Sequence, residues 1–277
     1  MKAGPRILAI LACGATMAAG AGPDYADPTW VLDWGAYPSQ ADLFAGPVDP
    51  RQGGRAWPIV LDEPGPWGTT GALQIFFPGG PADRQPENGV NWSLPDSSHT
   101  ELWLETWLRY DPWWTSGPHW PNDPTQERVA MDHKLMYFWQ GTYRPDQWWP
   151  NWQLKDGVWG DWISAAWHPD VWYRYAHDPV RADFGVDRAT AIASETALYD
   201  GAWHHLRIHV RSTTDGRARF ALSLDGRTVI DSGPIRIDDD TPFTMITFGS
   251  NRNTGNAEDM SLYFGPARVF LSNPGWL

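Results

Sequence analysis

Cysteine, lysine and long apolar runs are scarce in this sequence of 277 residues. Cys13 is the only cysteine, so the chain can form neither an internal disulfide nor a thiolate metal cluster. No apolar stretch approaches the roughly 20 residues that a membrane-spanning helix needs. Three lysines stand beside eighteen arginines, and Lys134 is one of the two lysines outside the first 21 residues. The formal charge of -12 opposes a general attraction to nucleic acid or to an anionic membrane.

The N-terminus has the features of an export signal. Lys2 and Arg6 precede an apolar run, and small residues follow up to Ala21. We therefore predict a signal peptide over residues 1–21 and a single domain over residues 22–277, which would be secreted, periplasmic or held at the cell surface. Ile-Leu-Ala before Cys13 resembles a bacterial lipoprotein processing site, so the alternative is a protein that is anchored by a lipid on Cys13.

Signals for helices are few, and signals for strands are many. The only plausible helical run covers residues 188–200, whereas residues 100–110, TELWLETWLRY, alternate with the period of a half-buried strand. The same period recurs in WHHLRIHVRS and ARFALSL, and an Asp225-Gly226 turn predicts a hairpin. The residues expected in one core are Leu102, Leu104, Leu108, Leu206, Ile208, Val210, Phe220 and Leu222. Short strands joined by glycine and proline turns predict an all-β fold, a two-sheet antiparallel jelly roll.

The succession DGAWHHLRIHVR, GRARFALSLDGRTVIDSG and SLYFGPARVFLSNPGW resembles the C-terminal half of concanavalin A-like jelly rolls. That superfamily includes lectins, laminin-G modules, glucanases and polysaccharide lyases, so the resemblance implies the fold more firmly than a function. It also implies that substrate lies across the concave sheet. The E-x-D-x-E arrangement of the glucanases is missing from this sequence.

The expected outward face of residues 100–110 alternates aromatic rings with charges. Its members are Glu101, Trp103, Glu105, Trp107 and Arg109. Indoles stack on sugar rings while carboxylates and a guanidinium bond to hydroxyls, so this face predicts a carbohydrate groove, with Lys134 or His133 on an adjoining strand. The alternative is a second core in which both tryptophans are covered. Glu101 and Glu105 lie about 13 Å apart on a strand, too far for a glycosidase pair, whose carboxyl groups are about 5 to 9.5 Å apart.

A lyase needs a group that neutralises a uronate, a base and an acid. The segment MDHKLMYFW offers His133, Lys134 and Tyr137, with Arg109 as a further candidate. His133 and Tyr137 would lie about 13 Å apart on one face of a regular strand, and Lys134 would lie on the opposite face. The alternating His205, Arg207, His209 and Arg211 would suit an acidic polysaccharide in a groove, or form solvated charge on a convex face.

Residues 147–173 hold seven tryptophans without clean alternation after Trp139, which predicts a tryptophan-rich loop insertion. Most of these rings should pack together, and Trp148 and Trp149 are the candidates for the wall of a sugar cleft. Acidic and amide side chains at 238–240 and 251–259 could bind calcium, although their spacing matches no defined site, and we expect no other cofactor.

Three functions agree with these patterns. The favoured one is a secreted protein that binds a polysaccharide without cleaving it. The alternatives are a lyase that cleaves a uronic-acid polymer by β-elimination and a surface module without a cleft. Whether the protein is an enzyme, and in which oligomeric state it exists, stays open.

Overall fold

The computed structural model shows how the strands that were predicted from the sequence are arranged in space. The described residues are 26–46, 48–50, 59–64, 66, 70–77, 88–111, 133–141, 151–156, 164–168, 200–234, 236–237, 240–249 and 259–276. Within them the helices are a short 3-10 turn, η1 (Trp34–Ala36), and α1 (Gln40–Phe44). Ser39 caps α1 by accepting a hydrogen bond from the backbone N–H of Asp42. The predicted signal over residues 1–21 and residues 188–199 of the predicted helix lie outside these ranges.

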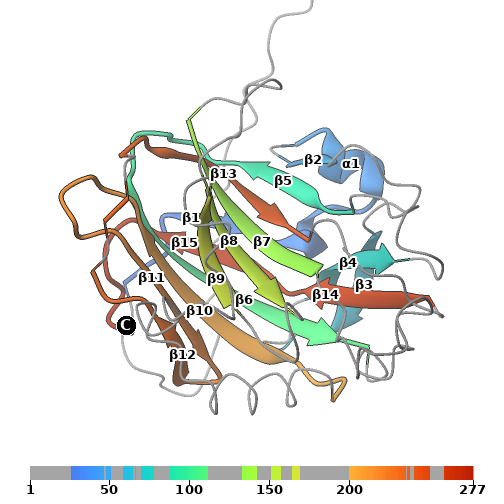
Figure 1. Ribbon diagram of the computed structural model, residues 1–277. Coiled ribbons are helices and arrows are strands. Elements are labelled where there is room, and N and C mark those ends of the chain that lie inside the picture. The colour runs from blue at the N-terminus through green and yellow to red at the C-terminus, as the bar shows by residue number, and fades with distance from the viewer. Residues whose placement is uncertain are drawn as a thin grey trace, which may run out of the picture.

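One antiparallel sheet has nine strands, in the order β12-β11-β10-β6-β14-β4-β3, with β15 also paired with β6 and β1 paired with β15. Its strands are β1 (Trp30–Leu32), β3 (Ile59–Pro64), β4 (Thr70–Phe77), β6 (Glu101–Tyr110), β10 (His204–Arg211), β11 (Arg219–Leu224), β12 (Arg227–Asp231), β14 (Met260–Phe264) and β15 (Ala267–Phe270). The hairpin of β11 and β12 forms one edge, and β3 with β4 forms the other (Figure 1).

The second antiparallel sheet has six strands, in the order β2-β5-β13-β7-β8-β9. They are β2 (Val48–Pro50), β5 (Val90–Ser93), β7 (His133–Gln140), β8 (Asn151–Asp156), β9 (Ser164–His168) and β13 (Phe243–Phe248). The neighbours of most strands come from distant parts of the chain. The two sheets form a β-sandwich of the jelly-roll type, as predicted.

The core lies between the sheets and contains the residues that the alternation predicts. Leu102, Leu104, Leu108, Leu206, Ile208, Val210, Phe220 and Leu222 are all 0% exposed. They pack in one cluster with Phe138, Ile246 and Phe248 from the second sheet. The prediction of these core positions is confirmed, because period-two alternation fixes which face of a strand becomes buried.

The predicted hairpin joins β11 to β12. Asp225 and Gly226 both have positive φ, of 48° and 80°. Two successive residues with positive φ are typical of the tight turns that match the twist of antiparallel strands. The Asp225-Gly226 prediction is therefore confirmed.

The tryptophan-rich segment contains strands where the sequence analysis predicted only a loop insertion. Asn151–Asp156 forms β8, which pairs with β7, and Ser164–His168 forms β9, which pairs with β8. The sequence NWQLKD does alternate polar with apolar residues, but six residues are too few to stand out beside the neighbouring tryptophans. These strands enlarge the second sheet.

Candidate functional site

The outward residues of β6 lie beside those of β10 on one face of the nine-stranded sheet, here called the β6 face. Its members are Glu101, Trp103, Glu105, Trp107 and Arg109 of β6, His205, Arg207, His209 and Arg211 of β10, and Arg268 of β15. The prediction that the five β6 residues share a face is confirmed by the register. The same register brings the basic residues of β10 next to them, which the sequence alone did not predict.

Glu105 is the centre of the charge network on the β6 face. Its carboxylate lies 2.7 Å from His205 Nε2, 3.3 Å from Arg207 Nε and 3.7 Å from an Arg268 nitrogen. Burial on its own raises the pKa of Glu105, but the hydrogen bond from His205 and the nearby positive charges outweigh burial and leave the pKa below its usual value. Glu105 is only 5% exposed, so its charge is held by these partners.

The two indoles of the β6 face are stacked on histidines. Trp103 stacks on His209 with ring centroids 4.5 Å apart, and Trp107 stacks on His205 with centroids 4.2 Å apart. Trp103 is 7% exposed and Trp107 6%. Burial dominates the shift at His209 and lowers its pKa, although the nearby Glu101 carboxylate acts in the opposite direction. These rings are packed and do not form an exposed platform.

This packing matches the alternative that the sequence left open, a second layer of buried side chains. A sugar-stacking indole needs an open face, and here each ring has one face against an imidazole. Arg109, at the end of β6, lies over the rings of Tyr263 and Trp203, with its guanidinium carbon 4.2 Å and 5.0 Å from their centroids. Three basic residues of β10 are paired with glutamates: His205 and Arg207 with Glu105, and His209 with Glu101.

The expectation that Lys134 or His133 adjoins the β6 face is wrong. Strand β7 pairs with β13 and β8 in the six-stranded sheet, because both edges of β6 are already occupied by β10 and by β14 and β15. Arg109 therefore belongs to a different sheet from the other lyase candidates. The structure does not bring these four residues together.

A β-bulge changes which candidates of β7 share a face. Lys134 pairs with Lys155 and Tyr137 with Gln153, and the register shifts between Lys134 and Met136. Lys155 and Gln153 are two residues apart on β8, so the bulge puts Lys134 on the same outward face as Tyr137, about 7 Å away along the strand. His133 takes the opposite face. The expectation from a regular strand is thus reversed for both residues.

The outward face of the six-stranded sheet is here called the β7 face. By register it holds Asp49, Asn91, Ser93, Lys134, Tyr137, Trp139, Asn151, Gln153, Lys155, Ser164, Ala166, His168, Met245 and Thr247. Amides, hydroxyls, lysines and aromatic rings are the groups that bind carbohydrate. Of these residues, the sequence analysis proposed only Lys134 and Tyr137 as candidates for a functional site. The alternation in NWQLKD is the signal that could have identified the members on β8.

Several residues of the β7 face are joined by described contacts. The rings of Tyr137 and Trp139 stack with centroids 4.8 Å apart. Trp139 Nε1 donates a hydrogen bond of 2.7 Å to the hydroxyl of Thr247, which donates one of 2.7 Å to Asn91 Oδ1. Tyr137 is 2% exposed and Thr247 0%, whereas Asn91 and Trp139 are half-buried. A hydrogen-bonded and aromatic network thus links β5, β13 and β7, in which Tyr137 and Thr247 are covered and Asn91 and Trp139 are partly exposed.

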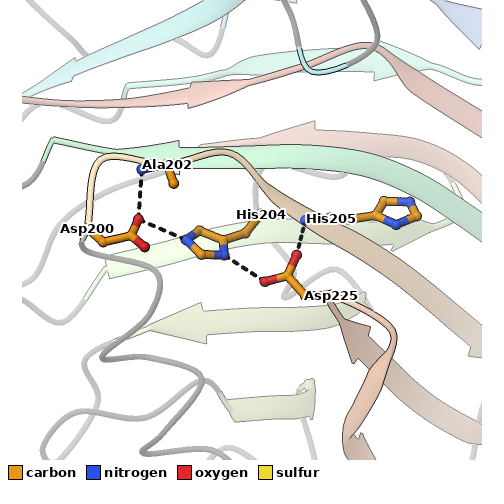
Figure 2. Close-up of polar contacts among 5 residues, drawn as sticks. All are labelled: Asp200, Ala202, His204, His205 and Asp225. Carbon is orange, nitrogen blue, oxygen red and sulfur yellow. Dashed lines mark hydrogen bonds and ion pairs between the residues drawn. The ribbon is translucent and has the colours of Figure 1, made fainter.

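A third cluster lies at the start of β10. His204 Nδ1 lies 2.7 Å from Asp225 and its Nε2 3.1 Å from Asp200 (Figure 2). Asp225 also accepts a hydrogen bond from the backbone N–H of His205, and Asp200 accepts one from that of Ala202. The imidazole is 6% exposed, so it joins the hairpin turn to the loop before β10 and is hidden from ligands. Its role is structural.

The remaining site predictions are not tested by the described residues. Trp148, Trp149, Asp238 and Asp239 lie outside them. Within the part of the chain that the structure describes, no group of three or more histidine, cysteine or acidic side chains could hold a metal ion. No helix in that same part is long and apolar enough to cross a membrane.

No protein-family model and no curated protein sequence matches this chain. Solved structures do resemble it. An alginate lyase, Aly36B, as a double mutant in complex with an alginate tetrasaccharide, superimposes with a TM-score of 0.56 at 15% identity over 88% of this chain and 97% of that chain. An endo-beta-1,4-glucuronan lyase from the fungus Trichoderma reesei superimposes with a TM-score of 0.54 at 11% identity over 88% of this chain and 96% of that chain. At these identities the likeness shows the fold, a jelly-roll β-sandwich of the kind found in polysaccharide lyases.

Proposed function

We propose that this protein is a lyase that binds a uronic-acid polysaccharide across the β7 face. The observation that carries the proposal is the pairing of Lys134 with Lys155. They are the only lysines after residue 2, and they occupy directly opposed positions on neighbouring strands in a chain of charge -12. Like charges opposed across two strands destabilise a sheet, unless an anion lies between them.

A uronate carboxylate is an anion of the right kind for this pair. The polymer presents one carboxylate on each acidic sugar, and neighbouring hydroxyls can bond to the amides and aromatic residues of the same face. The two lyases whose structures superimpose on this chain act, according to their names, on alginate and on glucuronan, which are both polymers of uronic acids. This likeness supports the choice of substrate class and of β-elimination over hydrolysis.

In β-elimination a base removes the proton at C5 of the uronate, the electron pair forms the C4=C5 double bond, and the C4–O bond breaks. The leaving oxygen then takes up a proton. Neutralisation of the carboxylate makes the C5 proton easier to remove, and this role falls to the lysine pair. Tyr137, about 7 Å along the strand from Lys134, is the hydroxyl that we assign to proton transfer.

Binding without cleavage is the second candidate, and the burial of Tyr137 favours it. A phenol that is 2% exposed and stacked on Trp139 is placed for packing more than for contact with a sugar. The β7 face would then recognise the polymer through its lysines, amides and Trp139 and release it unchanged. This candidate agrees with the function that the sequence favoured.

The test is incubation with alginate and with glucuronan, followed both by pull-down and by the ultraviolet absorbance of unsaturated products. A lyase gives rising absorbance, and a binding protein gives pull-down alone. The double variant Lys134→Ala/Lys155→Ala should lose binding, while Arg227→Ala, which removes an exposed positive charge from the other sheet, should not. Equal binding by the double variant and the unaltered protein would refute the proposal.

Tyr137→Phe separates the two candidates, because it keeps the stacked ring and removes the hydroxyl. Loss of product formation with retained pull-down would support proton transfer by Tyr137. If product forms at the unaltered rate, the proton is transferred by another group.

We also propose that the protein acts outside the cytoplasm, on the basis of the signal pattern of residues 1–21. The intact mass of exported protein should correspond to a chain that begins at or near Gly22. A lipid-modified Cys13 would support the anchored alternative.

A further inference from the structure

The orientation of the Asn91 amide is fixed by a chain of hydrogen bonds. An indole N–H can only donate, so the Thr247 hydroxyl accepts from Trp139 and has one proton of its own to place. Thr247 is 0% exposed, and within the described part of the chain its hydroxyl contacts only Trp139 and Asn91. The proton must therefore go to the amide oxygen, since a buried hydroxyl proton without an acceptor is costly.

It follows that the amino group of Asn91 faces away from Thr247. Asn91 is half-buried, and among the described residues its Nδ2 has no hydrogen-bond partner. A rigid amide that presents two N–H donors on a carbohydrate-type surface is suited to bind an acceptor oxygen of a ligand.

Asp49 lies directly opposite Asn91 on strand β2. The register puts both residues on the β7 face, and Asp49 is exposed. No lysine, arginine or histidine occurs on β2, β5 or β13. This end of the face therefore combines two amide donors with a carboxylate acceptor and carries a negative charge.

The other end of the face has the opposite charge. By register, Lys134 is two strand spacings and two residues away from Asn91, which corresponds to about 12 Å. The stacked rings of Tyr137 and Trp139 belong to the strand that carries Lys134. A carboxylate of the polymer would be attracted to the lysine end and repelled at the Asp49 end.

We infer that Asn91 and Asp49 form a subsite for a neutral sugar, with the amide donating to a hydroxyl oxygen and the carboxylate accepting from a neighbouring hydroxyl. The inference rests on the proposed function, because it assumes that the polymer crosses the β7 face. It adds that the preferred polymer carries a neutral sugar close to the uronate that the lysine pair binds. A pure polyuronate would place a carboxylate against Asp49.

The test compares two oligosaccharides of equal length, one made of glucuronate alone and one that alternates glucuronate with glucose. Their affinities are measured by calorimetry on the full chain in the Tyr137→Phe background, in which the hydroxyl assigned to proton transfer is absent. The alternating oligosaccharide should bind about tenfold more tightly than the homopolymer.

Two nearly isosteric substitutions test the residues. Asn91→Asp keeps the oxygen that accepts from Thr247 and replaces only the amino group, so the affinity for the alternating oligosaccharide should fall about tenfold. Asp49→Asn removes the repelling charge, so the affinity for the homopolymer should rise about threefold. Asp27→Asn, an exposed carboxylate before β1, is the control and should change neither affinity.

The results separate this inference from the proposed function. If Lys134→Ala/Lys155→Ala abolishes binding of both oligosaccharides while Asn91→Asp and Asp49→Asn change nothing, the neutral-sugar subsite is refuted and the proposed function stands. If the double lysine variant binds both as the unaltered chain does, the proposed function falls, and the subsite falls with it. Thermal melting identifies any variant that fails to fold. Should Asn91→Asp fail to fold, Asp49→Asn still tests the inference on its own.

Discussion

Replacement of Trp107 by alanine should destabilise the fold by about 4 kcal/mol, as expected for removal of a buried tryptophan from a packed site. The ring is 6% exposed and stacks on His205 at 4.2 Å with an interplanar angle of 20°. Gly265 also packs closely here, since a Cβ at that position would lie 2.9 Å from the Cβ of Trp107. The alanine variant would therefore leave a cavity that its neighbours cannot fill.

Urea unfolding measures the effect as a lower midpoint with an unchanged slope. Trp107→Phe is the matched control, because it keeps an aromatic ring against His205 and should cost about half as much or less. Polysaccharide pull-down is run on the same samples. If Trp107→Ala unfolds at the original midpoint but no longer binds polysaccharide, the ring contacts ligand, and the packed assignment of the β6 face is wrong.

Three further predictions concern the fold. Glu105→Gln should cost about 3 kcal/mol of stability at neutral pH. The folded pKa of Glu105 lies below 4.5, so the stabilising effect of its charge is present above pH 4.5 and is lost as the pH falls through the folded value. The glutamine variant, which lacks this charge, should therefore lose less stability in acid than the unaltered protein in urea unfolding at several pH values. Asp225→Ala should lower stability by about 2 kcal/mol, which thermal melting would measure. It removes the hydrogen bonds to the His204 ring and to the backbone N–H of His205, and it puts alanine at a position with positive φ. Gly89→Ala should cost about 2 kcal/mol or more, because its Cβ would lie 2.6 Å from the carbonyl oxygen of Phe248, and an unchanged melting temperature would contradict this close approach.

The two outer faces of the sandwich differ in how their polar groups are satisfied. On the β6 face the carboxylate of Glu105 is surrounded by basic side chains of neighbouring strands, and the indoles stack on histidines. On the β7 face the pairing register opposes two lysines, and the amino group of Asn91 has no partner among the described residues. A half-buried donor without a partner is better suited to ligand binding than a network that is already complete.

Much of the fold could be predicted from local patterns. The alternation in TELWLETWLRY and WHHLRIHVRS identifies Leu104 and Ile208 as core residues, because the period of a strand fixes which side chains share a face. The Asp225-Gly226 turn is similarly local, since its backbone conformation depends on those two residues. Both features need only neighbours in the sequence, and both are present in the structure.

The location of the candidate site was decided by tertiary structure alone. Which strand lies next to β7 depends on which sheet edges are still unpaired once the whole chain is packed, and no local period carries that information. The bulge at Leu135 adds one residue to β7, so Lys134 comes to the face of Tyr137 instead of the opposite one. The sequence by itself determined that the chain would form sheets with a leucine-rich core, whereas the contact of Glu105 with His205 and the pairing of Lys134 with Lys155 arise only when segments distant in the chain are hydrogen-bonded side by side.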